Sequence, residues 1–240
     1  MLPTEVVIAR IAEAAIAARP FSLVRCGDGE NLCMAQECVM PLDEVMRERW
    51  ARSKFKGVTL PDLKLRDRLV DAVRGSSIVG VHRWDDRMIR TSSRLKRPLL
   101  TRVFLHHGIR PKVICDATVT RYFPQRSDFW DTIRPHRVLL VSKWATRFAE
   151  LVRLPPYSLR ISGMIPCAVL DEVDAAIKMA EGLRDRFDVA LVSAGVNALI
   201  LASEIARIAK RPAVDFGKGM QFMLEGTAGL NAPTSRFAPR

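Results

Sequence analysis

Short runs of consecutive apolar residues alternate along this chain with segments of helical periodicity, and this alternation limits the fold more than any other feature. Two of the runs, 137–142 and 188–193, are apolar at nearly every position. A strand has this pattern when helices cover both of its faces. Helices between consecutive strands imply right-handed crossovers. The sequence therefore predicts an α/β fold, Rossmann-like, with a single doubly wound, mainly parallel sheet and helices on both faces.

The rest of the chain fits the same alternation. The predicted strands are 21–25, 77–82, 112–116, 137–142, 158–162, 188–193 and 212–216. The predicted helices are 4–18, 42–53, 62–74, 94–107, 143–152, 170–185 and 197–210, with a further helix starting at the segment Gly27-Asp28-Gly29-Glu30. No linker divides the chain, so we expect one domain over 1–225 and a loose tail over 226–240. We interpret 117–135, which is rich in arginine and aromatic residues, as a binding loop over the sheet edge.

The chain is strongly basic, with 38 lysines and arginines against 26 aspartates and glutamates and a net charge of +12. Most of the cations are arginines, which suit anionic ligands because guanidinium binds phosphate in a forked geometry. A GC-rich genome produces the same arginine excess, and composition does not separate the two explanations. The arginines are spread along the chain and no nucleic-acid motif occurs, so no nucleic acid partner is expected. The charge also suits peripheral contact with an anionic membrane or an acidic glycan.

The cysteine and histidine content gives no sequence signature of a metal site. The five cysteines are Cys26, Cys33, Cys38, Cys115 and Cys167, an odd count without a C-x-x-C pair. Cys33 and Cys38 are too widely spaced for a zinc knuckle, and reduced buried thiols in a cytoplasmic protein are the plain interpretation. We interpret His106-His107 as a basic cap at a helix C-terminus. No apolar run approaches the roughly 20 residues of a membrane span, so a soluble, cytoplasmic protein is expected.

Polar residues cluster just after the predicted strands, where ligands bind in doubly wound sheets. The candidate residues are Arg25, Gly27, Asp28, Gly29 and Glu30 after the first strand, Asp116, Thr120 and Arg121 after the third, Arg147 after the fourth, Ser193, Gly195 and Asn197 after the sixth, and Asp215 and Lys218 after the seventh. Carboxylates, cations and glycine turns at one edge suit an anionic ligand with a divalent metal. We interpret Asp85-Asp86 as a solvated turn.

Two of these segments have both a functional and a structural interpretation. In Asp28-Gly29-Glu30 the glycine turn lets both carboxylates face one ion or sugar, but an acidic helix N-terminus has the same residues. Ser193 to Asn197 joins a strand to a helix through a glycine turn, which forms an anion site from backbone N–H groups. An ordinary turn with Asn197 as a cap explains that segment equally well.

Three segments resemble the bacterial glycosyltransferases of the GT-D fold type. Phe21 to Glu30 is similar to the strand that ends in that family's G-D-G-E, its D-x-E motif. Asp116 to Arg121 resembles the central segment, an aspartate followed by an arginine. Leu191–Ala198 and Ala213–Gly217 together resemble the closing β-α-β unit. The three lie in the family's order across 21–219.

The resemblance implies an enzyme that transfers a sugar from a nucleoside-diphosphate sugar, typically a UDP-sugar, to a hydroxyl of a glycan or glycoconjugate. It implies that Asp28 and Glu30 serve the donor and a divalent metal, Mn²⁺ or Mg²⁺. By position, the residues at Ser193, Gly195 and Asn197 would line the diphosphate or sugar pocket, and Arg121 and Arg147 would neutralise the leaving diphosphate. Family members tend to carry histidine where this chain has Lys218, which cannot ligate a metal. We therefore hypothesise that Lys218 takes over part of the metal's role.

An inverting transferase also needs a carboxylate base, for which Asp116 and Asp215 are the candidates. The sequence does not choose between them. The alternative from another class is a noncatalytic module that binds nucleotide or polyanion on an arginine-rich face.

Overall fold

The structure, a computed structural model, describes residues 1–53 and 57–232. Its strands are β1 (Phe21–Cys26), β2 (Ile78–Val81), β3 (Ile114–Asp116), β4 (Arg137–Val141), β5 (Arg160–Ile165), β6 (Val189–Val192) and β7 (Pro212–Asp215). They form one sheet in the order β3-β2-β1-β7-β6-β4-β5, in which every neighbouring pair is parallel. Each predicted strand corresponds to one of these, and the prediction of a doubly wound parallel sheet is confirmed.

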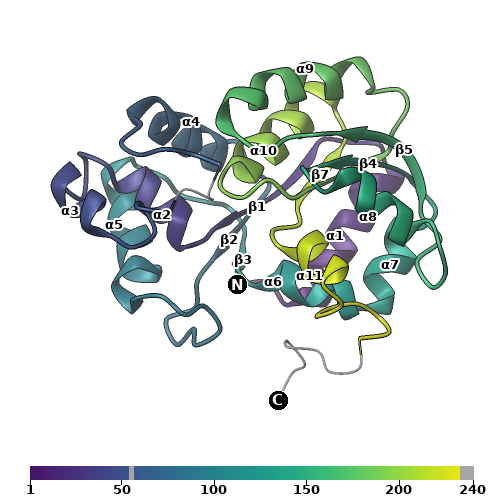
Figure 1. Cartoon of the computed structure of the whole chain (residues 1–240), viewed down its shortest axis with the longest axis horizontal. Helices are drawn as coiled ribbons and strands as arrows, with labels where there is room; N and C mark the ends of the chain where they lie inside the picture. Colours follow the sequence, from purple (N-terminus) through teal and green to yellow (C-terminus); the bar gives the residue numbers. More distant parts are fainter. Residues whose placement is uncertain (54–56, 233–240) are drawn as a thin grey trace.

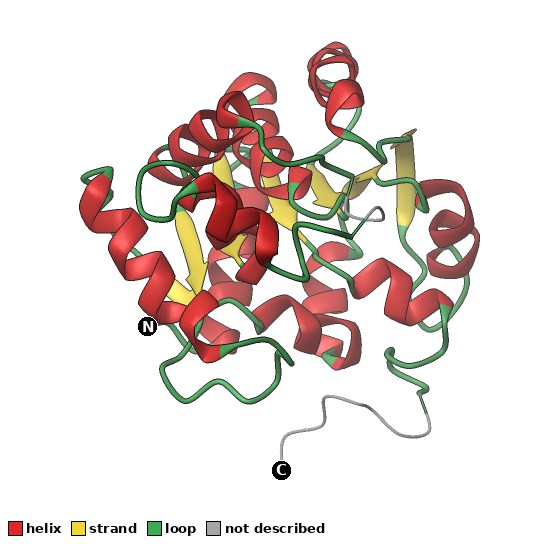
Figure 2. Ribbon diagram, turned by 60° about the vertical axis from the view of Figure 1, so that its left-hand side comes forward, coloured by secondary structure: helices red, strands yellow, loops and turns green. Residues whose placement is uncertain are grey.

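Helices cover both faces of the sheet (Figures 1 and 2). One layer contains α2 (Asp28–Ala35), α3 (Leu42–Arg47), α4 (Leu63–Arg74), α5 (Arg97–His106), α9 (Val173–Gly182) and α10 (Asn197–Ala209). The other contains α1 (Thr4–Ile16), α6 (Val119–Tyr122), α7 (Ser127–Ile133), α8 (Ala145–Val152) and α11 (Gly219–Leu224). Short 3₁₀ turns span Ser93–Leu95, Phe123–Gln125 and Leu170–Glu172.

Strand β6 shows why the central strands are apolar throughout. Its side chains alternate between the faces of the sheet, as they do in any strand. Ala190 and Val192 pack into the core beneath α10, whereas Val189 and Leu191 pack into the core on the α1 and α8 side. All four residues are buried, so neither face can tolerate a polar side chain.

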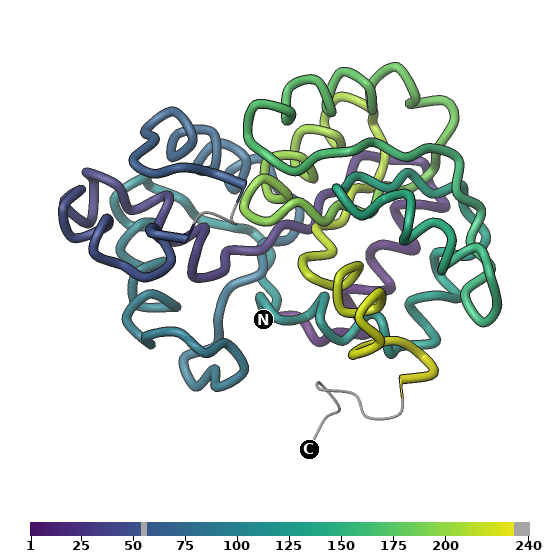
Figure 3. Tube along the Cα trace, viewed as in Figure 1, coloured from purple at the N-terminus to yellow at the C-terminus, as the bar shows by residue number. Residues whose placement is uncertain are grey.

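The order of the strands creates a switch point near the middle of the sheet. Strand β1 lies near the middle of the sheet, and β2 and β3 follow it in order toward one edge. The next two strands, β4 and β5, form the opposite edge. Strands β6 and β7 fill the gap between the two halves, so that β7 pairs with β1 (Figure 3). Loops that leave neighbouring C-terminal strand ends in opposite directions open a crevice there, which is where ligands bind in such sheets.

Segment 117–135 is not a binding loop, contrary to the sequence-based interpretation. It folds into α6, a 3₁₀ turn and α7, and its aromatic residues serve the core. Phe123, Phe129 and Trp130 are fully buried, and the first two stack with ring centroids 4.5 Å apart. Trp130 donates its indole N–H to the carbonyl of Pro124 at 3.0 Å. The aromatic content that suggested ligand contact is therefore explained by packing.

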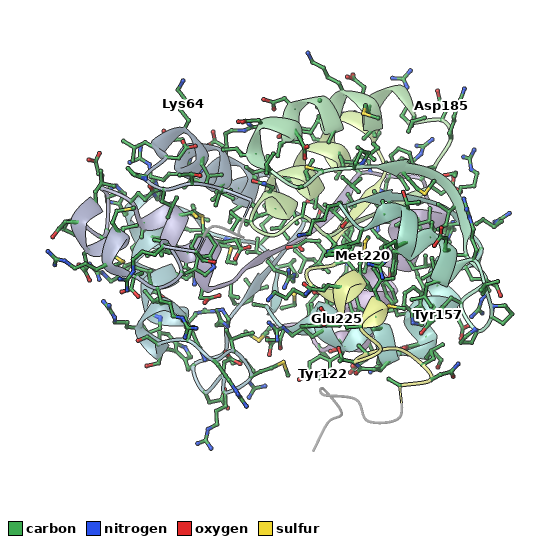
Figure 4. All side chains as sticks on the ribbon, viewed as in Figure 1. Lys64, Tyr122, Tyr157, Asp185, Met220 and Glu225 are labelled. Atoms are coloured by element: carbon green, nitrogen blue, oxygen red, sulfur yellow. The ribbon has the colours of Figure 1, made fainter. Side chains whose placement is uncertain are left out.

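Helix boundaries and the tail also differ from the predicted limits. The predicted helix 42–53 ends at Arg47. In the predicted tail, Ala228 is buried and the N–H of Leu230 donates to the Tyr157 hydroxyl at 3.1 Å, whereas 233–240 lie outside the described residues. Helix α11, just before it, packs through the buried Met220 while Glu225 beside its end is exposed (Figure 4).

Helices in the described ranges are short. The longest, α1 and α10, have 13 residues each. Such a helix is about 20 Å long, against about 30 Å for the hydrocarbon core of a bilayer. Among these residues no helix meets the length and hydropathy required to span a membrane.

Candidate functional site

A cleft of about 510 Å³ lies at the C-terminal edge of the sheet, above the switch point. Its walls come from the segments that follow five strands, namely β1, β4, β5, β6 and β7. Of the residues predicted from the sequence, it is lined by Arg25, Gly27, Asp28, Gly29, Glu30, Ser193, Gly195 and Lys218. Residues as far apart in the chain as Arg25 and Lys218, 193 positions, thus share one cavity whose volume falls in the range typical of small-molecule sites.

Asp28 and Glu30 occupy the first turn of α2, directly after β1. The Glu30 side chain folds back over the helix start, so that its Oε2 lies 2.7 Å from where a Cβ at Gly27 would be. Glycine is also required at position 29, because a Cβ there would overlap the indole of Trp50. The sequence G-D-G-E thus brings both carboxylates to the helix N-terminus, where the dipole favours negative charge.

The environment of Glu30 makes its negative charge costly. Burial raises the pKa of Glu30 to about 7, and the negative charges of Asp215 and Asp28 act in the same direction. Arg25 and the residue's own backbone N–H oppose this increase without cancelling it. A carboxyl group with this pKa is ready to exchange a proton for a cation near neutral pH.

Arg25 and Asp215 form a buried brace beneath the cleft. The guanidinium donates to Asp215 Oδ1 at 2.9 Å and to the carbonyl of Ala117 at 3.2 Å, so it ties β1 to the ends of β7 and β3. Asp215 Oδ1 also accepts the N–H of Gly217 at 2.9 Å. A Cβ at Gly217 would collide with the guanidinium, and the φ of +56° there also favours glycine.

The side chain of Asp215 is only 1% exposed and does not line the cleft. We therefore assign it to holding Arg25 and the Gly217 turn rather than to the role of base proposed from the sequence. Asp116, the other carboxylate proposed from the sequence for that role, does not line the cleft either. Asp116 Oδ1 accepts two hydrogen bonds from Thr118, from its N–H at 2.8 Å and its hydroxyl at 2.7 Å.

The loop between β6 and α10 forms another wall. Gly195 has a φ of +61°, which turns the chain tightly before α10 begins at Asn197. The Ser193 hydroxyl donates to the carbonyl of Gly217, so this loop is linked to the loop after β7. Asn197 is fully buried and its amide donates to the carbonyl of Gly57 at 3.2 Å. Asn197 thus supports the lining residue Gly57 instead of reaching the cleft itself.

Two tryptophans and a lysine that were not among the predicted site residues also line the cleft. They are Trp50, Trp144 and Lys143. The ammonium of Lys143 lies 4.8 Å from the ring centroid of Trp144, and the guanidinium of Arg147 lies 5.8 Å from it. Trp144 comes three residues after the end of β4, so its position near a strand end was a signal in the sequence. Trp50 had no such signal because only the fold brings it against Gly29.

Arg147 and the residues after β3 lie outside the cleft lining. Thr120 is buried, and Arg121 packs its guanidinium 5.8 Å from the ring centroid of Phe222. Burial lowers the pKa of Arg121 to about 10, assisted by the positive charge of Arg25. The negative charges of Asp86 and Asp28 act against this decrease. Arg121 and Arg147, which were proposed from the sequence to neutralise the diphosphate, therefore lie outside the lining of this cleft.

A buried polar cluster at the end of β2 was not predicted. His82 follows β2 and is 1% exposed, and its Nδ1 lies 3.2 Å from Asp86 Oδ2. The ammonium of Lys96 lies 2.9 Å from the same oxygen. The interpretation of Asp85-Asp86 as a solvated turn is wrong for Asp86. Burial lowers the pKa of His82, while the charges of Asp86 and Asp28 oppose the decrease. The cluster supports the strand end beside the cleft.

Comparison with known protein families assigns this architecture to one of them. The model of the GT-D-like family, described as a GT-D fold-like domain, matches residues 2–223. The chain belongs to the GT-D-like family. The match covers all seven strands and every residue that lines the cleft. No curated protein matches the sequence.

Solved structures show the same fold at low sequence identity. A structure described as a new glycosyltransferase (DUF1792) from Streptococcus sanguinis is 15% identical, with a TM-score of 0.58, over 93% of this chain and 85% of that one. Another, described as showing that the highly conserved domain of unknown function 1792 has a distinct glycosyltransferase fold, is 17% identical. It has a TM-score of 0.55 over 95% of this chain and 87% of that one. These likenesses extend the GT-D assignment to the arrangement of the whole sheet.

Proposed function

We propose that this GT-D-like protein is a glycosyltransferase that transfers a sugar from a nucleoside-diphosphate sugar, a UDP-sugar, to a hydroxyl of a glycan or glycoconjugate. The observation that carries the proposal is one cleft in which Asp28 and Glu30 share the lining with Lys143, Lys218 and two indoles. The solved structures of the same fold that are described as glycosyltransferases support this activity. The cytoplasmic location expected from the sequence belongs to the same proposal.

Each part of a nucleotide sugar has a matching part of the cleft. An indole of Trp50 or Trp144 offers a flat surface on which a nucleobase can stack. The N-termini of α2, α8 and α10 face the cleft edge, and their dipoles favour the negative charge of a diphosphate. Lys143 and Lys218 add cationic charge at that edge. Together these groups stabilise the departing nucleoside diphosphate, the main electrostatic requirement of the transfer.

The carboxylates of Asp28 and Glu30 fit a hard divalent cation. Two carboxylates and a diphosphate together supply the oxygen ligands that Mg²⁺ or Mn²⁺ prefers. A bound cation would also offset the negative charge of Glu30, which the environment of that residue makes costly. When bound, such an ion neutralises negative charge on the diphosphate. Lys218 lies in the same cleft and contributes charge there whether or not a metal is present. Activity measured in EDTA separates the contribution of the metal from that of Lys218. Complete loss of activity in EDTA, restored by Mn²⁺, would contradict a metal-independent role for Lys218.

The acceptor hydroxyl requires a base if the transfer inverts the anomeric carbon. Of the two carboxylates considered from the sequence, Asp215 is committed to Arg25 and Gly217, which favours Asp116. Loss of turnover with retained UDP binding in Asp116→Asn would support this assignment. Normal turnover in that variant would remove Asp116 from the mechanism.

The central experiment combines binding and turnover. We expect UDP to raise the thermal midpoint and DNA to leave it unchanged, because a ligand at 100 times its Kd adds about 2.7 kcal/mol of stability. A UDP-sugar should be hydrolysed slowly, and Asp28→Ala and Glu30→Ala should abolish this. Glu5→Ala, at an exposed acidic position 20 residues before the first lining residue, Arg25, is the matched control. UDP binding without turnover of any sugar nucleotide would support the noncatalytic module, and unchanged binding and turnover in both variants would refute the proposed site.

A further inference from the structure

Three potential metal ligands meet at the end of the molecule that contains α2, α3 and α5 (Figures 1 and 3). Cys38 lies in the turn after α2, His106 is the last residue of α5 and His107 follows it. The Sγ of Cys38 is 3.4 Å from Nε2 of His107. One ligand atom from each of the three residues lies within 4.8 Å of the others. None of the three lines the cleft that contains Asp28 and Glu30.

The exposure and position of these side chains suit metal binding. Cys38 differs from the other four cysteines because it is not buried. The Nε2 of His107 faces the Cys38 sulfur, and an imidazole nitrogen holds a metal through its lone pair. His106 is exposed, and its ring meets that of His107 edge to face with the centroids 4.8 Å apart.

We propose that Cys38, His106 and His107 bind a divalent ion of the zinc type, separate from any metal at the donor cleft. Thiolate and imidazole are the ligands that zinc prefers, with Zn–S near 2.3 Å and Zn–N near 2.0–2.1 Å. In a tetrahedral site these lengths place sulfur and nitrogen about 3.6 Å apart, close to the observed 3.4 Å. His106 must approach by roughly 1 Å, which rotation of an exposed side chain supplies. Water completes the fourth position.

Two guanidinium groups near the three ligands are each paired with a carboxylate. Arg66 and Arg74 add positive charge near the site. The carboxylate of Asp67 supplies the opposing negative charge and pairs with Arg66 at 2.8 Å. Asp71 pairs in the same way with Arg74 at 3.0 Å. These two ion pairs cancel, so a divalent ion bound to one thiolate and two neutral imidazoles leaves a net charge of +1 at the site.

A bound ion would connect the C-terminal side of α2 to the end of α5. Helix α2 begins with Asp28 and has eight residues, so its two ends are about 12 Å apart. The ion would thereby stabilise the helix that presents Asp28 and Glu30 without contacting either of them. The inference does not depend on the proposed transferase activity, because its ligands and its probe differ from those of the donor site.

Cobalt provides the direct test, since Co²⁺ replaces Zn²⁺ and a thiolate ligand gives a charge-transfer band that oxygen ligands do not. The full chain, freed of metal with EDTA and then dialysed, is titrated with Co²⁺. We expect one ion per chain with a thiolate band that Zn²⁺ abolishes. Cys38→Ser should remove the band, and His106→Asn and His107→Asn should each weaken binding at least about tenfold.

The double variant Asp28→Asn, Glu30→Gln is the control, and it should keep the band at full intensity. Zn²⁺ should also raise the thermal midpoint of the unmodified chain and of this control, but not that of Cys38→Ser. Absence of the band in the unmodified chain, or its persistence in Cys38→Ser, would overturn the proposal. Loss of the band in the control would assign the ion to the donor cleft instead.

Discussion

Replacing Glu30 by glutamine should make the metal-free protein more stable at alkaline pH while abolishing its activity. Glutamine has nearly the same shape as protonated glutamate and carries no charge, so it occupies the first turn of α2 without the cost of burying an ionised carboxylate. That cost is expressed in the pKa of Glu30, which burial raises from 4.5 to about 7. Each unit of pKa corresponds to about 1.4 kcal/mol, so the displacement corresponds to about 3 kcal/mol.

The direction of the effect follows from proton binding. Because the folded chain holds the Glu30 proton more tightly than the unfolded chain, this stabilisation is complete below the unfolded pKa of 4.5 and is lost as the pH rises through about 7. Glutamine does not titrate. The stability of Glu30→Gln relative to the unmodified protein should therefore increase by about 2–3 kcal/mol between about pH 5 and about pH 8.5.

Urea unfolding of both proteins in EDTA across this pH range measures the difference directly, because other titrating groups contribute equally to both and cancel. Glu5→Gln, at an exposed position in the first turn of α1, is the matched control and should show no such trend. A stability difference between Glu30→Gln and the unmodified protein that stays constant from pH 5 to 8.5 would refute the electrostatic reasoning about this site.

Three further substitutions test the cleft. Trp144→Ala should weaken UDP binding by about 1–3 kcal/mol in calorimetry if its indole stacks on the base, and unchanged affinity would exclude that contact. Asp215→Ala should lower the free energy of unfolding by about 3 kcal/mol in urea, because it leaves the guanidinium of Arg25 buried without its partner. A loss below about 1 kcal/mol would show that Asp215 is not a structural brace. Gly29→Ala should reduce both stability and turnover, since Trp50 must move to admit a Cβ, and a variant indistinguishable from the unmodified protein in both would contradict that packing.

The strands and their order in the chain were predictable because burial on both faces leaves a local pattern. Continuous apolar runs such as 137–142 mark strands with a helix layer on each side, and the residues after them mark the C-terminal edge of the sheet. Aromatic residues carry no such positional information. Phe123 and Trp130 have the composition of a ligand-binding loop, yet both pack into the core.

The sequence by itself determined the doubly wound sheet and the position of Asp28-Gly29-Glu30 at a strand end, because periodicity and glycine turns act over a few neighbouring residues. Only the tertiary structure decided which polar residues share the cleft. It buried Asp215 against Arg25, 190 positions away, and brought Trp50 onto Gly29. It also placed Cys38 beside His107, which lie 69 positions apart in the chain. Contacts of this kind depend on how helices pack against the sheet, and no local pattern encodes that packing.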